Sequence, residues 1–101
     1  MKKPGKVTYG VQALTDIKQI FDYVSLDSPS RAADLVERIV KEVSRLSQFP
    51  RLGLIPKSAR LQAKGYRVLV VNDFLIFYGL RGRAVRIRRV LHGARRYAAL
   101  L

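Results

Sequence analysis

Apolar positions in the first half of the chain recur with the 3.6-residue period of an amphipathic helix. One stripe runs through Ala13, Leu14, Ile17, Ile20, Phe21 and Val24, and a second through Ala32, Leu35, Val36, Ile39, Val40, Val43 and Leu46. The break between them is Asp27-Ser28-Pro29, where Ser28 suits an N-cap and Pro29 a first helical position. The pattern predicts two helices that form an antiparallel hairpin, with the second helix ending at Phe49-Pro50.

The second half of the chain is rich in β-forming residues. Pro50, Gly53 and Pro56 indicate a loop that continues to about Ala63. Three predicted strands follow, at Tyr66–Val71, Phe74–Leu80 and Ala84–His92. They are separated by Asn72-Asp73 and Arg81-Gly82, which suit tight turns, so we expect these strands to be sequential and antiparallel.

The predicted fold class is α+β, in one domain of residues 1–101. Residues Lys6–Val11 can form a first strand, which gives the order β-α-α-β-β-β. A helical hairpin packed on one face of a small antiparallel sheet is the natural two-layer arrangement for this order. There is no repeat, low-complexity tract or long linker to divide the chain.

The strand Phe74 to Tyr78 reads FLIFY and is apolar on both of its faces. A sheet with helices on one side and water on the other should instead alternate apolar with polar residues. The second face must therefore be covered as well, either by the C-terminal YAALL segment of this chain or by a partner.

The net charge is +13, and it is concentrated in the second half of the chain. Residues 1–50 hold eight Lys or Arg and six Asp or Glu, whereas residues 51–101 hold twelve basic residues and Asp73 as the single acid. The stretch RIRRVLHGARRYAALL, from Arg86 to Leu101, is dense in arginine and contains the single histidine. This asymmetry favours an anionic partner, either nucleic acid or an acidic protein.

Several kinds of chemistry are disfavoured by the sequence. The chain has no cysteine, no Gly-rich phosphate loop and no cluster with metal-ligand spacing, so we expect no metal, no cofactor and no small-molecule substrate. No segment approaches the length of an apolar membrane span, and the N-terminus lacks the apolar region of a signal peptide. We therefore expect a cytoplasmic protein without a membrane partner.

Four sequence segments, in this order, resemble the RelE/ParE superfamily of toxins from type II toxin–antitoxin systems. They are DIKQIFDYV, LSQFPRLG, GYRVLVVNDFLIFY and IRRVLHGARR. The VLHGAR terminus resembles the ParE-like and plasmid-stabilization branch in particular. That branch usually continues with an acidic residue after the arginine, whereas this chain has Arg96.

The resemblance implies a growth-inhibiting toxin that is neutralised by a cognate acidic antitoxin and that meets operator DNA only through that antitoxin. In the ParE-like branch the target is DNA gyrase and no catalysis is required. In the RelE-like branch the toxin is a ribosome-dependent mRNA interferase, an endoribonuclease. We favour gyrase inhibition, with the RelE-like activity as the first alternative. A non-toxic basic module that binds nucleic acid is the second.

Candidate site residues follow from these alternatives. For a RelE-like reaction the catalytic candidates are Arg67, Arg95, His92 and Tyr97, of which Arg67 matches the arginine of the family's GYR motif. Arginine could clamp a phosphate, while an imidazole or phenol moves a proton. For binding of nucleic acid or another target the candidates are Lys64, Arg67, Arg86, Arg88, Arg89, Arg95 and Arg96. Alternation places Arg86 and Arg88 on one strand face and Arg89 on the other, unless a β-bulge near Arg88-Arg89 changes that assignment.

Overall fold

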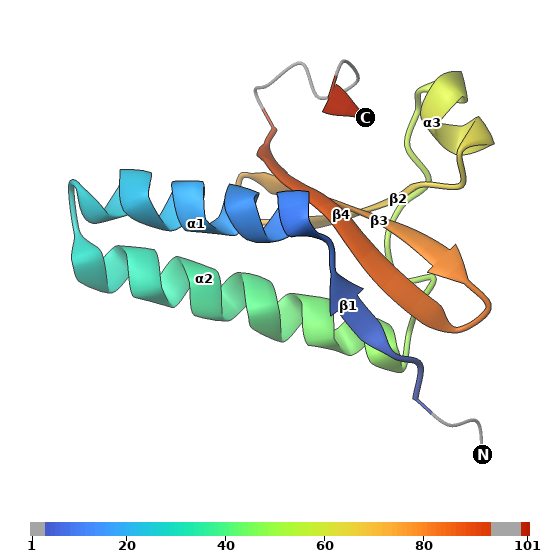
Figure 1. Cartoon of the computed structure of the whole chain (residues 1–101), viewed down its shortest axis with the longest axis horizontal. Coiled ribbons are helices and arrows are strands. Elements are labelled where there is room, and N and C mark those ends of the chain that lie inside the picture. The colour runs from blue at the N-terminus through green and yellow to red at the C-terminus, as the bar shows by residue number, and fades with distance from the viewer. Residues whose placement is uncertain (1–3, 94–99) are drawn as a thin grey trace.

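The computed structural model describes residues 4–93, 100 and 101, and its elements follow the predicted order with one short helix added. They are β1 (Val7–Tyr9), α1 (Val11–Ser25), α2 (Pro29–Ser44), the 3₁₀ turn η1 (Arg45–Ser47), α3 (Ala59–Ala63), β2 (Arg67–Val71), β3 (Phe74–Arg81) and β4 (Ala84–His92). The hairpin of α1 and α2 lies along the sheet and reaches past its end, while α3 stands apart (Figure 1). The predicted α+β fold and helical hairpin are confirmed.

The four strands are arranged in the order β1-β4-β3-β2. The pairs β2–β3 and β3–β4 are antiparallel, as predicted, but β1 pairs with β4 in parallel, so the sheet is mixed rather than wholly antiparallel. The helical hairpin is the reason. It returns the chain to the start of β1, where the Gly5 N–H donates to Ser47 O. As a result β2 runs in the same direction as β1, and so does β4.

One core lies between the helical hairpin and the sheet. Ala13, Ile39 and Val43 of the helices pack there with Tyr78 and Ile87 of the strands. Both predicted helical stripes contribute, but they are wider than the face that is buried. Leu14, Phe21 and Val40, all predicted to be apolar-stripe positions, are between 37% and 54% exposed on the outer side.

A second, smaller core covers the other face of the sheet, as the FLIFY strand predicted. Buried Phe77 packs there with Leu61 of α3, and Tyr66 and Leu101 pack against this cluster. The predicted loop through Ala63 therefore contains a helix, which begins after Ser58, whose hydroxyl accepts the Leu61 N–H. The chain covers this face with α3 and Leu101, and residues 97–99 of the YAALL segment lie outside the described residues.

Candidate functional site

A β-bulge in β4 decides which way its arginines point. Ile87 pairs with Tyr78 and Arg89 with Phe77, so Arg88 is the extra residue opposite this step. Arg89 is thereby opposite Phe77, whose side chain faces the second core. The β-bulge considered near Arg88-Arg89 is therefore present. It brings Arg89 to the same side of the sheet as Arg86 and Arg88.

These three arginines line one depression on the face of the sheet that is turned away from the helical hairpin. The depression, of about 400 Å³, is lined by Gly10, Val11, Gln12, Tyr66, Arg86, Arg88, Arg89, Leu100 and Leu101. We call it the basic depression, because three arginines and no acid are among the described residues that line it. Arg88 is exposed, and Arg86 donates from Nη1 to Thr8 Oγ1 over 3.4 Å. Lys64 lies close by, since its Nζ donates to Leu101 O over 2.9 Å.

Arg89 differs from its two neighbours because it is held by a buried carboxylate. Asp16 of α1 is 5% exposed, and its two oxygens accept from Arg89 Nε over 2.8 Å and from Arg89 Nη2 over 3.0 Å. The hydrogen bonds to Asp16 raise the pKa of Arg89 above its ordinary value. Asp16 also accepts the Val90 N–H over 2.9 Å, at a point of β4 beyond the residues that β1 pairs with. Asp16 thus accepts a backbone N–H at the β4 edge that a longer β1 would otherwise pair with.

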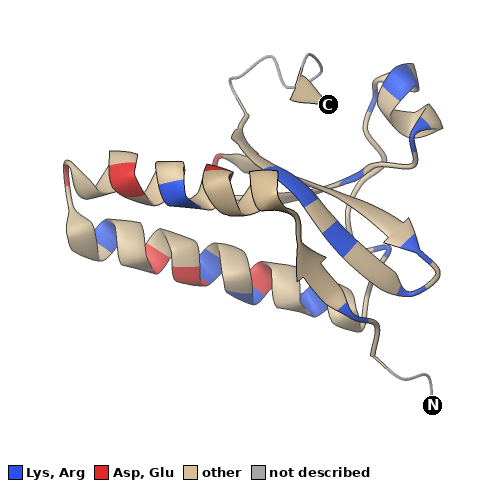
Figure 2. Cartoon of the chain, in the orientation of Figure 1, with Lys and Arg blue, Asp and Glu red and all other residues tan. Residues whose placement is uncertain are grey.

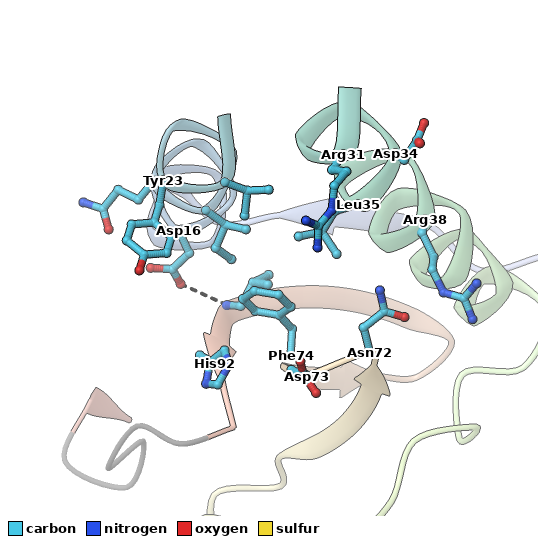
Figure 3. A pocket seen from close by; sticks show the side chains of 14 residues that line it. Asp16, Tyr23, Arg31, Asp34, Leu35, Arg38, Asn72, Asp73, Phe74 and His92 are labelled. Carbon is cyan, nitrogen blue, oxygen red and sulfur yellow. Dashed lines mark hydrogen bonds between the residues drawn. The ribbon is translucent and has the colours of Figure 1, made fainter. Parts of the chain in front are cut away.

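A second, larger hollow lies between the projecting part of the helical hairpin and the end of the sheet, and we call it the hairpin pocket. Its volume is about 810 Å³, and Figure 3 shows Asp16 at one side with the dashed hydrogen bond to Val90. Apolar lining comes from Ile20, Val24, Leu35, Phe74 and Val90, and charged lining includes Arg31, Asp34, Arg38 and Asp73. Asp16 lines this pocket while Arg89 lines the basic depression, so their ion pair lies between the two hollows.

His92, the catalytic candidate among the described residues of the VLHGAR stretch, belongs to the hairpin pocket. Its ring stacks edge-on against Phe74, with centroids 5.4 Å apart and an interplanar angle of 88°. His92 pairs with Phe74, which packs on the helix-side core. The imidazole is therefore on the opposite face of the sheet from Arg86 and Arg88.

Arg67, the candidate from the GYR motif, ties a loop to the sheet. Its Nη1 donates to Gly53 O over 2.9 Å and to Arg51 O over 3.3 Å. It pairs across the strands with Tyr78, which points into the helix-side core. Arg67 thus lies on the helix side, away from the basic depression. Both acceptors are backbone carbonyls, so the Arg67 guanidinium is engaged within the fold.

The predicted catalytic set is therefore not brought together among the described residues. Arg67 and His92 share the helix side of the sheet but lie far apart, because they pair with Tyr78 and Phe74, four positions apart along β3. The arginines of the basic depression lie on the other side. Arg95, Arg96 and Tyr97 fall outside the described residues. Of the binding candidates, Lys64, Arg86, Arg88 and Arg89 gather around the basic depression.

Two residues of the site region were missed by the sequence-based prediction. Asp16 falls between Ala13 and Ile17 on the apolar stripe of α1, and an acid at such a position signals a buried partner. Tyr78, read as part of an apolar strand, is fully buried, and its hydroxyl donates to Pro50 O and accepts the Gly53 N–H, both over 2.8 Å. Burial raises the pKa of Tyr78, although the hydrogen bond from Gly53 and the charge of Arg67 act in the opposite direction.

Charge is unevenly distributed over the fold. Figure 2 shows most of the acidic residues on α1 and α2, and basic residues along β4, around the β3–β4 turn and on α3. Within the described ranges no group of three His, Asp or Glu side chains could hold a metal ion. In the same part of the chain no helix is both long and apolar enough to cross a membrane.

A family model and a relative each match nearly the whole chain. The family model for the ParE toxin of the type II toxin–antitoxin system, parDE, matches residues 7–97. A Sinorhizobium fredii protein called "Putative toxin Y4kP" is 27% identical over 96 residues, which cover 95% of this chain and 96% of that protein.

Solved structures share the fold. A structure of the chromosomal ParDE toxin–antitoxin system from P. aeruginosa matches with a TM-score of 0.72 and 26% identity, over 87% of this chain and 95% of that one. A chain of the RelBE2 toxin–antitoxin complex from Mycobacterium tuberculosis matches in fold with a TM-score of 0.59 and 22% identity, over 88% of this chain and 98% of that one. This chain belongs to the ParE family of toxins from type II toxin–antitoxin systems.

Proposed function

We propose that this toxin inhibits DNA gyrase without catalysing a reaction, that an acidic antitoxin neutralises it, and that it acts in the cytoplasm. Gyrase inhibition is the activity associated with the ParE family. The observation that carries the proposal is the distance between the two candidate catalytic groups that the structure describes. Arg67 pairs with Tyr78 and His92 with Phe74, four positions apart along β3, or about 13 Å of strand. Catalysis of RNA cleavage needs the phosphate clamp and the proton-transfer group within hydrogen-bond reach of one reacting centre.

The basic depression is the proposed target-binding surface. Arg86 and Arg88 are exposed there, and no acid is among the described residues that line it. Guanidinium groups suit either an acidic protein surface or the phosphates of gyrase-bound DNA, because they form paired hydrogen bonds with carboxylate and with phosphate.

The antitoxin is the second proposed partner. The matched P. aeruginosa structure is described as a ParDE toxin–antitoxin system, and the net charge of this toxin is +13. An acidic protein would gain from that charge both in the rate of encounter and in affinity. Operator DNA would be contacted through the antitoxin, as in other type II systems.

The RelE-like alternative keeps one supporting observation. Arg86, Arg88 and Tyr66 line the same depression, and such a group could hold a phosphate and a proton donor together. Under this alternative the basic depression, and not Arg67 or His92, would be the reactive site.

The test is a charge reversal of the two exposed arginines, Arg86→Glu with Arg88→Glu. Purified wild-type toxin should inhibit supercoiling by gyrase, and the double variant should lose that inhibition while its thermal unfolding stays cooperative. Arg31→Glu with Arg38→Glu, on α2, is a control that changes the charge equally and should leave inhibition intact. Codon-specific cleavage of transcripts by the wild type would select the RelE-like alternative. Normal growth of a host that accumulates the folded toxin would favour the non-toxic binding module.

A further inference from the structure

One glycine in the interior of β3 is not required by the fold. Gly79 follows Phe77 by two positions, so it faces the side of the sheet that is turned away from the helical hairpin. Its φ is not positive, so the backbone conformation does not demand glycine. Apart from its chain neighbours, no described residue comes within 4 Å of the position that a Cβ would take. Glycine inside a strand often marks the close approach of a ligand or another backbone, and here that group must come from a partner.

Arginine side chains border the open position at Gly79. Its cross-strand partner is Arg86 of β4, and paired residues place their side chains on the same face. The Arg86 guanidinium reaches towards the start of α1, where its Nε lies 3.6 Å from the position that a Cβ on Gly10 would take. Arg88 follows on the same face of β4 and also lines the basic depression. We call the surface formed by Gly79, Arg86 and Arg88 the glycine floor.

The charges on this surface are not neutralised within the described residues. Arg89 is paired with Asp16, but no carboxylate pairs with Arg86 or Arg88 in that part of the chain. The first turn of α1, which lies beside Arg86, contains no acidic residue. Two exposed guanidinium groups beside an open stretch of backbone therefore favour an anion that can approach the main chain closely.

The composition of the surface favours a phosphate backbone over an acidic protein. Between residues 81 and 91, every side chain that is larger than alanine and is not buried is an arginine. The cores of protein–protein interfaces are depleted in charged residues, whereas protein–DNA interfaces are polar and strongly positive. A second copy of the toxin would bring like charges together, so self-association through this face is disfavoured.

We propose that the glycine floor binds the phosphodiester backbone of duplex DNA. Arg86 and Arg88 hold neighbouring phosphates, and Gly79 lets the sugar–phosphate chain approach the sheet. These contacts go to the DNA backbone alone, so no base sequence is read. The inference rests on the proposed function, because it names DNA as the part of the gyrase–DNA complex that this surface contacts. It concerns the free toxin and is separate from operator binding, which is assigned above to the antitoxin.

A labelled duplex of mixed sequence, titrated with purified toxin and followed by fluorescence anisotropy, measures the binding. Arg86→Gln with Arg88→Gln should raise the dissociation constant at least about tenfold and should lower the steepness of its salt dependence by about two, one for each lost phosphate contact. Arg31→Gln with Arg38→Gln, at two exposed positions of α2, is the matched control and should keep the wild-type salt dependence. Equal effects of the two double variants would overturn the proposal, because binding would then follow net charge alone.

Gly79→Val tests the shape of the site without changing any charge. The added side chain has room in the fold, so thermal unfolding should remain cooperative, while duplex binding should weaken about tenfold. Ala33→Leu, at an exposed position of α2, adds the same number of carbon atoms away from the sheet and should bind as the wild type does. Wild-type affinity in Gly79→Val would refute a close approach of the DNA backbone at Gly79.

Two competing ligands identify the chemistry that is recognised. The duplex should bind more tightly than either poly-glutamate or a single-stranded RNA of the same sequence. Tighter binding of poly-glutamate would overturn the proposal in favour of an acidic protein surface. Tighter binding of the RNA would overturn it in favour of a messenger RNA.

A supercoiling assay with purified gyrase separates this inference from the proposed function. A toxin that inhibits supercoiling but binds no duplex would refute the DNA contact and leave gyrase as the target. A toxin whose duplex binding depends on Gly79, Arg86 and Arg88, but which leaves supercoiling unimpaired, would refute the target while the DNA contact stands.

Discussion

Asp16 of α1 and Arg89 of β4, separated by 73 positions in the sequence, form a two-point ion pair at the place where the edge of β4 loses β1 as its neighbour. The same carboxylate accepts the Val90 N–H. One side chain therefore fixes α1 to the sheet, satisfies the strand edge and orients one arginine of the basic depression.

Asp16→Asn should lower the free energy of unfolding by about 3 kcal/mol, because the Arg89 guanidinium loses its buried counter-charge. The amide oxygen can still accept the Val90 N–H, so the sheet edge should survive. Chemical denaturation measures the change. Asp22→Asn removes the exposed pair with Lys18, whose atoms lie 2.9 Å apart, and should cost less than about 0.5 kcal/mol. Equal losses in the two variants would contradict the role given to Asp16.

Tyr78→Phe should lower the free energy of unfolding by about 1–3 kcal/mol, since the Gly53 N–H and Pro50 O lose their buried partner. The variant should also change how stability depends on pH. The folded-state pKa of Tyr78 is raised above its ordinary value of 10.0, so its contribution is complete below pH 10 and is lost as the pH rises beyond that value.

Denaturation curves between pH 7 and pH 11 test this dependence. Wild-type stability should fall at the alkaline end, and Tyr78→Phe should fall less steeply. Part of the decline should remain in the variant, because burial also raises the pKa of Tyr9. A variant with the same alkaline slope as the wild type would show that Tyr78 does not contribute to it.

Gly53→Ala should destabilise the protein by about 1–3 kcal/mol through overpacking. An added Cβ would lie 2.6 Å from Tyr78 Oη and 2.9 Å from Val68 O, and neither neighbour is free to move. Gly79→Ala is a suitable control, because its Cβ would meet nothing within 4 Å. Thermal unfolding should separate the two variants clearly, and similar melting temperatures would mean that the loop is less tightly fixed than its hydrogen bonds indicate.

Arg67→Ala should cost about 1 kcal/mol in stability and leave gyrase inhibition largely intact. The lost hydrogen bonds go to the carbonyls of Arg51 and Gly53, so the expected defect is a looser loop. Arg81→Ala, at the exposed end of β3, serves as the control for loss of one charge. Toxicity that disappears in Arg67→Ala at unchanged stability would instead place Arg67 in contact with the target.

Much of this fold could be predicted from local pattern, because two helical stripes, a proline-marked break and two tight turns each determine a short stretch of chain. The parallel pairing of β1 could not, since it depends on where the helical hairpin returns the chain. The helix α3 was missed because its five residues are too few to show a period. Alternation alone placed Arg89 on the wrong face, and the bulge that moves it is a property of the β3–β4 register.

The candidate site was harder to predict than the fold. Arginine density pointed to β4, which lines the basic depression, but density does not say which guanidinium groups are already engaged. Arg89 pairs with Asp16 and Arg67 with the Gly53 carbonyl. A backbone partner cannot be predicted from residue types, because every residue carries a carbonyl. Asp16 was visible in principle as an acid on an apolar stripe, but its partner lies far away in the sequence.

Non-catalytic inhibition of gyrase by the surface around Arg86 and Arg88 is tested most directly by one paired measurement on the purified toxin. Supercoiling by gyrase and primer extension on transcripts translated in vitro are followed as toxin is added, with the Arg86→Glu, Arg88→Glu double variant alongside. We predict that the wild type inhibits supercoiling while transcripts remain intact, and that the double variant affects neither supercoiling nor transcripts. Unimpaired supercoiling together with codon-specific cuts in the transcripts would contradict non-catalytic inhibition of gyrase.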